Sequence, residues 1–574
     1  MNAATQGLVR LPVWRARFVL ALLLLAFAVL VGRSLHLQAV KTDFLQEKGD
    51  ARYSRVLEVP ATRGNIVDRH GDALAVSTPV KSVWAIPADA RLTSAEKKKL
   101  LRLLGMEADE LDKRLADESR DFVYLKRQLA PDTADAVAAL GLPGIHQQRE
   151  YRRYYPGGEV TAHVVGFTGV DDMGQEGVEL AFQHHLGGKP GSRRVIKDRL
   201  GHIVEDVESI RSAQHGRDLA LSIDGKLQSL AFGALKDAVR QHRAKAGALV
   251  ALDVRSGEVL ALVNVPSFNP NSRARLTGAQ LRNRAVTDVF EPGSTLKPFT
   301  VALALETGKV SPSTPIATAP GRLTISNYTI RDVHPESALT IAQVIQKSSN
   351  VGSAKLALAM SREAMWDVYR RVGFGEPPQL GFPGAAAGRL RHYRSWRPIE
   401  QATMAYGHGI SVSLVQLARA YMVFARDGEL VPLTLVKTNT AASGDKVLSM
   451  QTARSVRAML ELAVQPGGTG PRARIMGWRV AGKTGTAHKP ENGGYAADKY
   501  IASFVGFAPA SAPRLVIAVM IDEPNAGQHY GGAVAAPVFA QVMQGALRML
   551  GAPHDAPLQP LELPGEEEEL KEST

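Results

Sequence analysis

A single long apolar run near the N-terminus limits, more than any other feature, how this chain can fold. Phe18–Gly32 reads FVLALLLLAFAVLVG, and the charged residues before it are all basic: Arg10, Arg15 and Arg17. A helix needs about 20 residues to cross a bilayer, and the run reaches that length by continuing to Val40 with Arg33 extended towards the interface. We therefore predict a cytoplasmic tail over 1–17, a membrane anchor over 18–40 and an extracytoplasmic body.

A cleaved signal peptide is the alternative interpretation of the same run. Ala26-Phe27-Ala28 has the small-x-small pattern of a cleavage site, but it lies inside the apolar stretch rather than after it. This position favours the uncleaved anchor. No other run in the sequence reaches membrane length, so we expect a single span.

The composition excludes several classes of protein. Of 574 residues, 45% are hydrophobic and 22% charged, which is the balance of globular domains. At about 150 residues per domain, the length allows two to four domains. There is no cysteine, which excludes disulfide scaffolds, thiolate metal sites and cysteine nucleophiles. The net charge of +13 is spread along the chain and aromatic residues make up only 6%, which disfavours nucleic-acid binding.

Two regions with different sequence patterns follow the anchor. Residues 41–218 contain short mixed segments, many charges and no grouping that suggests catalysis. Over 219–553, strand patterns at both ends enclose long helical patterns, including Phe299–Thr307 and Leu339–Met360. This arrangement indicates an antiparallel sheet covered by helices, an α+β domain. Residues 554–574 are rich in Pro and Glu, and we predict a disordered tail there.

Three short motifs in the second region carry the chemistry: Ser294-Thr295-Leu296-Lys297, Ser348-Ser349-Asn350 and Lys483-Thr484-Gly485-Thr486. Ser294 and Lys297, three residues apart on a helix, share one face, and a desolvated lysine can take the serine proton. A residue at the start of a helix also has a free backbone N–H that can face an oxyanion. Gly485 would let a ligand backbone approach the strand edge closely.

Each motif alone is weak, because the sequence contains a decoy for two of them. Ser94–Lys97 fits the first pattern, but it lies in a charged helix whose lysine should stay solvated. Ser267–Asn269 fits the second, but it lies in a Pro- and Asn-rich loop ahead of Ser294. The order of the three motifs, each in its expected context, is far more specific than any one of them. The histidines show no metal-ligand spacing, so a zinc hydrolase is not expected.

In this order the motifs resemble those of class B penicillin-binding proteins, and most closely the cell-division peptidoglycan transpeptidases of Gram-negative bacteria. The resemblance runs from the anchor to about residue 550 and includes five further segments: Arg63–Arg69, Arg153–Gly158, Gly174–Glu179, Tyr406–Gly409 and Gly467–Gly470. It implies a transpeptidase domain of the serine DD-peptidase and β-lactamase-like fold over 219–553. It also implies a pedestal, or dimerisation-like, domain over 41–218 that contacts partners.

The resemblance implies a catalytic role for five residues. Ser294 would attack the carbonyl of the penultimate D-alanine of a pentapeptide stem, with Lys297 as its base. Ser348 would pass a proton to the departing D-alanine. Asn350 would orient the substrate amide and hold Lys297, and Lys483 would place positive charge near Ser348. An amine of a neighbouring stem would then resolve the acyl-enzyme as a cross-link.

The resemblance also implies how the substrate is bound. Thr484 or Thr486 would hydrogen-bond the substrate carboxylate beside Gly485, and the backbone N–H groups of Ser294 and Thr486 would form the oxyanion hole. Two residues of the Gly-rich turn, Tyr406 and Gly409, would shape the wall of the site. His408, between them, is predicted to be structural rather than catalytic.

No metal ion or other cofactor is expected. The expected partners are peptidoglycan stem peptides, β-lactams that acylate Ser294, the membrane, a separate glycan polymerase and other division proteins, without nucleic acid. The expected location is the bacterial inner membrane at the septum, with the catalytic domain in the periplasm. Three alternatives stay open: an elongation-type class B transpeptidase, a DD-carboxypeptidase or β-lactam hydrolase, and a non-enzymatic scaffold or β-lactam sensor.

Overall fold

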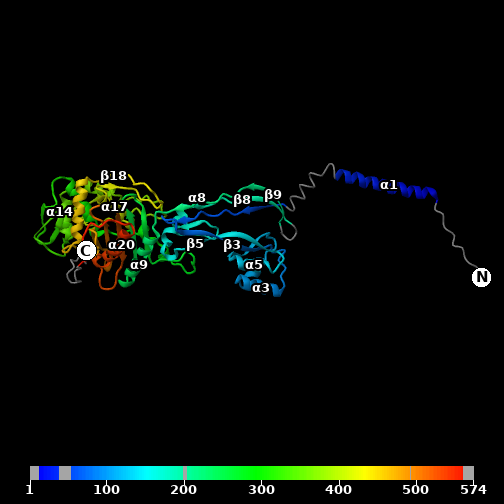
Figure 1. Cartoon of the computed structure of the whole chain (residues 1–574), viewed down its shortest axis with the longest axis horizontal. Coiled ribbons are helices and arrows are strands. Elements are labelled where there is room, and N and C mark those ends of the chain that lie inside the picture. Colours follow the sequence, from blue (N-terminus) through cyan, green and yellow to red (C-terminus); the bar gives the residue numbers. More distant parts are fainter. Residues whose placement is uncertain (1–11, 38–53, 198–202, 492, 560, 562–574) are drawn as a thin grey trace, which may run out of the picture. The chain divides into compact units, whose positions relative to one another are not determined.

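The computed structural model describes residues 12–37, 54–197, 203–491, 493–559 and 561 (Figure 1). The chain divides into two compact units, both discontinuous in sequence. The unit that holds the expected transpeptidase domain, called the transpeptidase unit below, contains Thr62–Thr78, Tyr151–Gly187 and the chain from Gly216 onwards. The other, called the pedestal unit, contains the chain up to Ala61, Pro79–Glu150 and Gly188–His215. Two segments of the predicted pedestal domain therefore group with the catalytic body, and the limit at 218 stays a prediction.

One helix, α1 (Val13–Leu35), begins five residues before the predicted anchor. Its mean hydropathy reaches 2.5, and among the described residues it is the one helix long and apolar enough to cross a membrane. Trp14, Arg15 and Arg17 form its first turns, which is where a membrane helix places aromatic and basic residues at the interface. Residues 38–40 of the predicted anchor and residues 1–11 of the predicted tail lie outside the described residues.

The core of the transpeptidase unit is a five-stranded antiparallel sheet in the order β12-β11-β21-β20-β19. Its strands come from the two ends of the predicted domain: β11 (Ala246–Asp253), β12 (Val259–Val265), β19 (Ala481–Glu491), β20 (Gly494–Ala508) and β21 (Leu515–Asp522). The predicted α+β class is confirmed. The strand of the third motif, β19, starts at Ala481 and runs on through Lys483-Thr484-Gly485-Thr486.

Both faces of this sheet are buried, and the alternation along β11 shows how. Ala248, Val250 and Leu252 belong to one apolar cluster, whereas Leu249 and Ala251 belong to another. Successive strand residues point to opposite faces, so one strand serves two cores. The first cluster is closed by α17 (Leu414–Ala425), and the second by two helices, α9 (Gly225–Gln241) and α20 (Ala536–Met549) (Figure 1).

The helices that carry the first two motifs pack near one edge of this body. They are α12 (Lys297–Glu306), α13 (Ile341–Gln346) and α14 (Asn350–Leu358), and α18 (Met450–Val464) packs beside α12, α13 and β19. The expected single helix over Leu339–Met360 is wrong. The chain leaves the helical conformation after α13, and Ser348 adopts a left-handed φ of +59° before α14 begins.

The pedestal unit has its own small core. Its helices α3 (Ser94–Leu104), α4 (Ala108–Leu115) and α5 (Pro131–Ala138) pack with β4 (Val123–Leu129), which pairs with the second half of β3 (Ala73–Ala85). Thr93 and Glu96 form a capping box at the start of α3, as a Thr-x-x-Glu pattern predicts. A separate antiparallel sheet joins three strands: β1 (Ser54–Val59), β8 (Gly191–Lys197) and β9 (Ile203–Arg211).

The remaining elements are short. They are β2 (Ile66–Val67), β5 (Ile145–Tyr154), η2 (Gly158–Val160), α6 (Ala162–Val165), β6 (Phe167–Thr168), β7 (Gly174–Glu176), α7 (Gly177–Ala181), α8 (Gln183–Leu186), β10 (Leu219–Ala220), α10 (Gly278–Leu281), α11 (Arg284–Thr287), η3 (Gly293–Leu296), β13 (Pro315–Ala317), β14 (Arg322–Ile325), β15 (Tyr328–Arg331), β16 (Ala338–Thr340), α15 (Arg362–Arg371), η4 (Tyr393–Ser395), α16 (Pro398–Met404), β17 (Glu429–Leu430), β18 (Asp445–Lys446), η5 (Pro471–Ala473) and α19 (Gly531–Val534).

A buried charge cluster within the transpeptidase unit joins three of the segments that carry the family resemblance: Arg63–Arg69, Arg153–Gly158 and Gly174–Glu179. Glu179 lies between two arginines: its Oε2 is 2.5 Å from Arg63 Nε and its Oε1 is 2.7 Å from Arg153 Nε. All three side chains are fully buried. Arg63 also donates to the Asp172 carbonyl, and Arg153 to the Gly64 carbonyl. These contacts fix the segments 62–78 and 151–187 to each other.

Candidate active site

The first motif forms a tight turn that leads into α12. Gly293 has a left-handed φ of +56°, the short 3₁₀ turn η3 carries Ser294, and Lys297 opens α12 with Pro298 behind it, where a proline suits the first helical turn. Lys297 Nζ lies 2.8 Å from Ser294 Oγ. Both side chains are buried, Ser294 at 2% exposure and Lys297 at 0%. The predicted serine–lysine pair is formed in this structure.

The break between α13 and α14 brings the second motif to the same lysine. Lys297 Nζ lies 2.9 Å from Ser348 Oγ and donates to the Ser348 carbonyl at 2.6 Å. One amine therefore contacts both serine hydroxyls. A neutral amine has two N–H donors and one lone pair, so it can donate to Ser348 and still accept the Ser294 proton.

Asn350, the first residue of α14, is buried, and its side-chain amide donates to the Arg331 carbonyl at 3.3 Å. Among the residues that the structure describes, its Oδ1 has no hydrogen-bond partner. The expected contact in which Asn350 holds Lys297 is therefore not formed here. A buried acceptor without a donor costs free energy, and a substrate amide N–H would satisfy it.

Asp332 positions the second motif from outside it. Its Oδ1 accepts from the backbone N–H groups of Asn350 (2.6 Å) and Val351 (3.0 Å), and its Oδ2 accepts from Ser349 Oγ (2.6 Å). The carboxylate thus caps the N-terminus of α14, where the helix dipole favours negative charge. No sequence pattern singled out Asp332, because it lies 18 residues before Asn350 in an ordinary loop.

The third motif lies on β19. Lys483 is fully buried, and its Nζ lies 3.1 Å from Thr484 Oγ1 and 3.3 Å from Thr469 Oγ1. Thr469 belongs to the Gly467–Gly470 loop, and its hydroxyl is also 2.7 Å from that of Thr484. Thr486 Oγ1 accepts from the Gly531 N–H at 3.0 Å.

Gly485 also has a packing role. A Cβ at this position would lie 2.5 Å from Ser503 Oγ, 2.8 Å from Thr295 Cγ2 and 2.9 Å from the Pro292 carbonyl oxygen. The space that a side chain would occupy is thus filled, in part by the turn that carries the nucleophile, and the approach of a ligand to the edge of β19 stays a prediction. Gly485 therefore lets β19 and the Ser294 turn pack against each other.

The Gly-rich turn contacts Glu291, three residues before the nucleophile. The Glu291 carboxylate accepts from the Gly409 N–H at 2.8 Å and from the Tyr495 hydroxyl of β20 at 2.9 Å. Gly409 has a φ of +81°, and the buried Tyr406 packs edge-on against His408. Glu291 and Tyr495 are site residues that the motif pattern did not identify. Glu291 thus joins its own segment to the Gly-rich turn and to β20, which are distant in sequence.

His408 is neutral in this setting. Its Nδ1 lies 3.5 Å from Glu291 Oε2, which would favour the charged imidazolium. Burial outweighs this contact and lowers the pKa of His408 to about 4. The ring packs between Tyr406 and Tyr495. These contacts agree with the structural role predicted for His408.

Neither decoy takes part in the site. Lys97 is paired with Asp112, 2.5 Å away, on the exposed face of the pedestal unit. Ser267 donates to the Glu159 carbonyl. The structure thus brings together the residues of the three ordered motifs and leaves the two lookalikes in ordinary surface contacts.

Comparisons with known proteins agree with this geometry. Residues 247–544, which contain all three motifs, match the penicillin binding protein transpeptidase domain, and residues 58–221 match the penicillin-binding protein dimerisation domain. The chain is 45% identical to the peptidoglycan D,D-transpeptidase FtsI of Escherichia coli (strain K12), over 95% of this chain and 93% of that one. It is 44% identical to the probable peptidoglycan D,D-transpeptidase PenA of Neisseria gonorrhoeae, over 95% of this chain and 94% of that one.

A solved structure supports the same assignment. The transpeptidase domain of Burkholderia pseudomallei penicillin-binding protein 3, in its apo form, aligns with a TM-score of 0.55 and 50% identity, over 59% of this chain and 98% of that one. Both domains and most of the length are matched, and the three motifs meet as the family requires. The chain therefore belongs to the class B penicillin-binding proteins.

Proposed function

We propose that this chain is a serine-type peptidoglycan D,D-transpeptidase that cross-links stem peptides through an acyl-enzyme on Ser294, and that β-lactams acylate the same serine. The observation that carries the proposal is the position of Lys297 Nζ, 2.8 Å from Ser294 Oγ and 2.9 Å from Ser348 Oγ in a buried site. Relatives named as D,D-transpeptidases support it: they are 44–45% identical to this chain, and the alignments cover 95% of it.

In the first half-reaction, Ser294 Oγ attacks the carbonyl carbon of the penultimate D-alanine while its proton passes to Lys297. Lys297 must be neutral at this step, because only the amine lone pair can accept the proton. When the tetrahedral intermediate collapses, the bond to the terminal D-alanine nitrogen breaks. Lys297 returns the proton to that nitrogen through the Ser348 hydroxyl, and the terminal D-alanine leaves as a free amino acid.

In the second half-reaction, an amine of a neighbouring stem attacks the Ser294 ester. The amine loses a proton along the same Ser348–Lys297 relay, and the C–Oγ bond breaks. The products are a new amide cross-link and a reprotonated Ser294. The backbone N–H groups of Ser294 and Thr486 would stabilise the oxyanion in both halves, each donor contributing about a hundredfold or more in rate.

We assign three further residues to substrate binding. Asn350 offers its unpartnered Oδ1 to the substrate amide N–H. Lys483 supplies positive charge for the terminal carboxylate of the substrate, and Thr486 is the residue that would hydrogen-bond that carboxylate. Tyr406 and Gly409 shape the wall of the cleft. The domain limits at 218 and 553 belong to this proposal as well.

Labelling with fluorescent penicillin tests the acyl-enzyme. The full-length chain should be labelled, and Ser294→Ala should lose the label, whereas Ser353→Ala, a buried serine that donates to the Ser349 carbonyl, should keep it. Label that persists in Ser294→Ala would overturn the assignment. Release of D-alanine with and without an acceptor amine separates the transpeptidase from a carboxypeptidase, because only the transpeptidase incorporates the amine into product.

We further propose that the protein acts at the division septum, with α1 in the inner membrane, the catalytic domain in the periplasm, and a separate glycan polymerase as partner. Similarity to FtsI over nearly the whole chain supports this choice over the elongation enzyme. Depletion should produce filaments with no septa, and a fluorescent fusion should collect at midcell. Rounded cells with a dispersed fusion would instead indicate the elongation role.

A further inference from the structure

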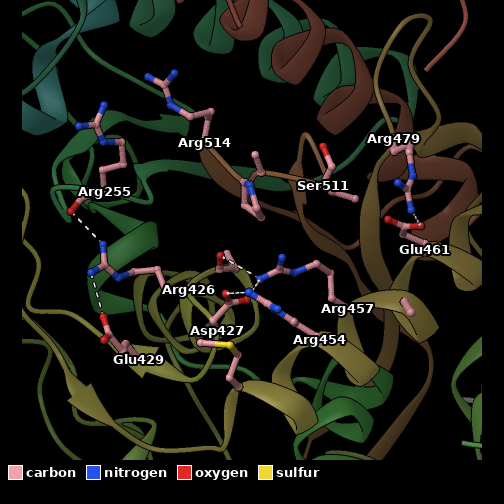
Figure 2. A pocket seen from close by; sticks show the side chains of 16 residues that line it. Arg255, Arg426, Asp427, Glu429, Arg454, Arg457, Glu461, Arg479, Ser511 and Arg514 are labelled. Carbon is pink, nitrogen blue, oxygen red and sulfur yellow. Dashed lines mark hydrogen bonds and ion pairs between the residues drawn. The ribbon is translucent and has the colours of Figure 1, made fainter. Parts of the chain in front are cut away.

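A second hollow lies on the transpeptidase unit, away from the catalytic residues. It encloses about 790 Å³ and is lined by six arginines, which together we call the arginine pocket: Arg255, Arg426, Arg454, Arg457, Arg479 and Arg514. They come from the β11–β12 turn, the end of α17, α18, the segment before β19 and the start of β21. Figure 2 shows their side chains around the cavity. None of the residues assigned to catalysis lines it.

The carboxylates in this pocket do not balance its arginines. Three acidic side chains line it. Asp427 pairs with Arg454 (2.8 Å) and Arg457 (2.6 Å). Glu429 pairs with Arg426 at 3.0 Å, and Glu461 pairs with Arg479 at 2.7 Å. Six positive charges against three negative ones leave an excess of three. A concave surface of one sign concentrates the field and attracts a ligand of opposite charge.

Two arginines remain available to such a ligand. In the part of the chain that the structure describes, Arg255 and Arg514 have no ion-pair partner, and in Figure 2 no dashed line reaches the Arg514 guanidinium. The Nε atoms of Arg514 and Arg426 are buried and have no hydrogen-bond acceptor. Guanidinium groups bind carboxylates through paired N–H donors, so a ligand with several carboxylates would satisfy these donors.

The chain itself carries such a ligand close by. Residues 562–574 contain six glutamates, four of them consecutive at Glu566–Glu569, against one lysine. The described chain approaches the pocket just before this segment. Asp555 accepts from the Arg479 backbone N–H at 2.7 Å and from Ser511 Oγ at 2.7 Å, and both Arg479 and Ser511 line the pocket.

This approach is well anchored. The His554 ring packs on Trp478 with centroids 4.1 Å apart, and the Trp478 indole N–H donates to the Pro553 carbonyl at 3.0 Å. These contacts hold Pro553, His554 and Asp555 against the transpeptidase unit. Glu566 follows Asp555 by eleven residues, a length that can extend over at most about 36 Å. A tethered segment this close to its site has a high effective concentration, so weak contacts suffice to hold it.

We propose that the acidic C-terminal segment 562–574 docks into the arginine pocket of its own chain. The glutamates at 566–569 pair with Arg255, Arg514 and the outer arginines of the pocket. Because these contacts lie near the surface, ionic strength weakens them: the screening length falls from about 10 Å at 0.1 M salt to about 3 Å at 1 M.

The absence of cysteine allows a direct distance measurement in the full-length chain. Spin labels at Gln451→Cys, an exposed position beside the pocket, and at Leu570→Cys in the tail should give a short, narrow distance distribution at low salt. The distribution should become broad and longer in 1 M salt, and also when Glu566, Glu567, Glu568 and Glu569 are all changed to Gln. An identical distribution in parent and four-glutamine variant would overturn the proposal.

A second measurement tests whether the arginine pocket is the surface that binds residues 562–574. A chain ending at Leu561 should bind a synthetic peptide of residues 562–574, and Arg255→Gln with Arg454→Gln should weaken binding roughly tenfold. Lys236→Gln with Lys245→Gln removes the same charge from exposed positions elsewhere and should leave binding unchanged. Melting temperatures equal to that of the parent would show that the variants are folded. No peptide binding, or equal loss in both double variants, would overturn the proposal.

Discussion

Ser348 reaches Lys297 because its backbone is left-handed. With φ at +59°, Ser348 interrupts what would otherwise be one helix, and its hydroxyl comes to lie 2.9 Å from Lys297 Nζ. A non-glycine residue in this region is uncommon and costs about 1 kcal/mol or more, which the surrounding structure must supply. Lys297 Nζ donates hydrogen bonds to the Ser348 carbonyl and hydroxyl oxygens, and these two bonds offset that cost within the site.

Removal of the Ser348 hydroxyl should slow acylation without abolishing it. In Ser348→Ala the nucleophile and Lys297 remain in contact, but the proton relay to the leaving group is lost, and such a proton transfer contributes about a hundredfold or more. The second-order rate of β-lactam acylation measures the effect. Ser353→Ala is the matched control on α14 and should acylate at the parent rate. Equal rates for the two variants would remove Ser348 from the relay.

The local part of the site could be predicted from sequence, and the non-local part could not. Ser294 and Lys297 are three residues apart on a helix, so their contact follows from helix geometry alone. Five polar residues, Gln346–Asn350, interrupt the apolar pattern at the break, but they do not indicate that the Ser348 hydroxyl comes to lie beside Lys297. Gly485 signals a close approach, but not that the Ser294 turn is what approaches. Asp332 and Glu291 act through contacts that only the folded chain creates.

Asp332 should matter for acylation although it does not touch the substrate. Asp332→Ala removes the cap from α14, so Asn350 and the Ser349 hydroxyl lose the acceptors at 2.6 Å that hold them. We expect a loss of about 1 kcal/mol in the free energy of unfolding and a larger proportional loss in the acylation rate. Unfolding by urea and β-lactam acylation measure the two quantities.

Asp253 supplies the control for Asp332. It is equally buried, and it also accepts from two backbone N–H groups and a serine hydroxyl, but in the β11–β12 turn. Asp253→Ala should therefore lower the free energy of unfolding by a similar amount and leave the acylation rate unchanged. If both variants acylate equally slowly, Asp332 has a general structural role and does not position the second motif.

A methyl group at Gly485 should separate β19 from the nucleophile. In Gly485→Ala the new Cβ would meet Ser503, Thr295 and Pro292 within 2.9 Å, and the Pro292 carbonyl is backbone that cannot rotate away. We expect a clear loss of both acylation rate and stability. In α9, Gly233→Ala meets nothing within 4 Å and should instead stabilise the chain by about 0.5–1 kcal/mol. An active, fully stable Gly485→Ala would contradict the packing described here.

The Glu179 cluster should be among the most sensitive positions for stability. Glu179→Gln leaves Arg63 and Arg153 buried without their counter-ion, and removal of one partner from a buried ion pair costs about 3–5 kcal/mol. Glu159→Gln breaks an exposed pair with Lys236 and should change the free energy of unfolding by less than about 0.5 kcal/mol. Denaturant unfolding of the two variants, side by side, measures the difference. Equal small effects would show that the cluster contributes little.

His163 gives a pH dependence whose sign can be stated. It is buried, its Nε2–H donates to the Gln280 carbonyl at 2.7 Å, and burial lowers the pKa of the ring to about 4. The ordinary value is 6.5, so as pH falls from 6.5 towards 4 the unfolded chain takes up a proton that the folded chain refuses. The stability that His163 contributes is present above pH 6.5 and is lost through that window, up to about 3 kcal/mol.

Other groups titrate in the same range, so the wild-type curve alone cannot isolate His163. Burial raises the pKa of Asp172 to about 6, and this group favours the folded state as pH falls. His408 has the same direction as His163. Asp172 and His408 are both unchanged in His163→Gln, and the new glutamine amide can still donate to the Gln280 carbonyl. The difference in free energy of unfolding between parent and His163→Gln, measured from pH 7.5 to 4.5, therefore reports on His163. As pH falls, the parent should lose stability relative to His163→Gln. A difference that stays constant with pH would show that the ring is not held neutral.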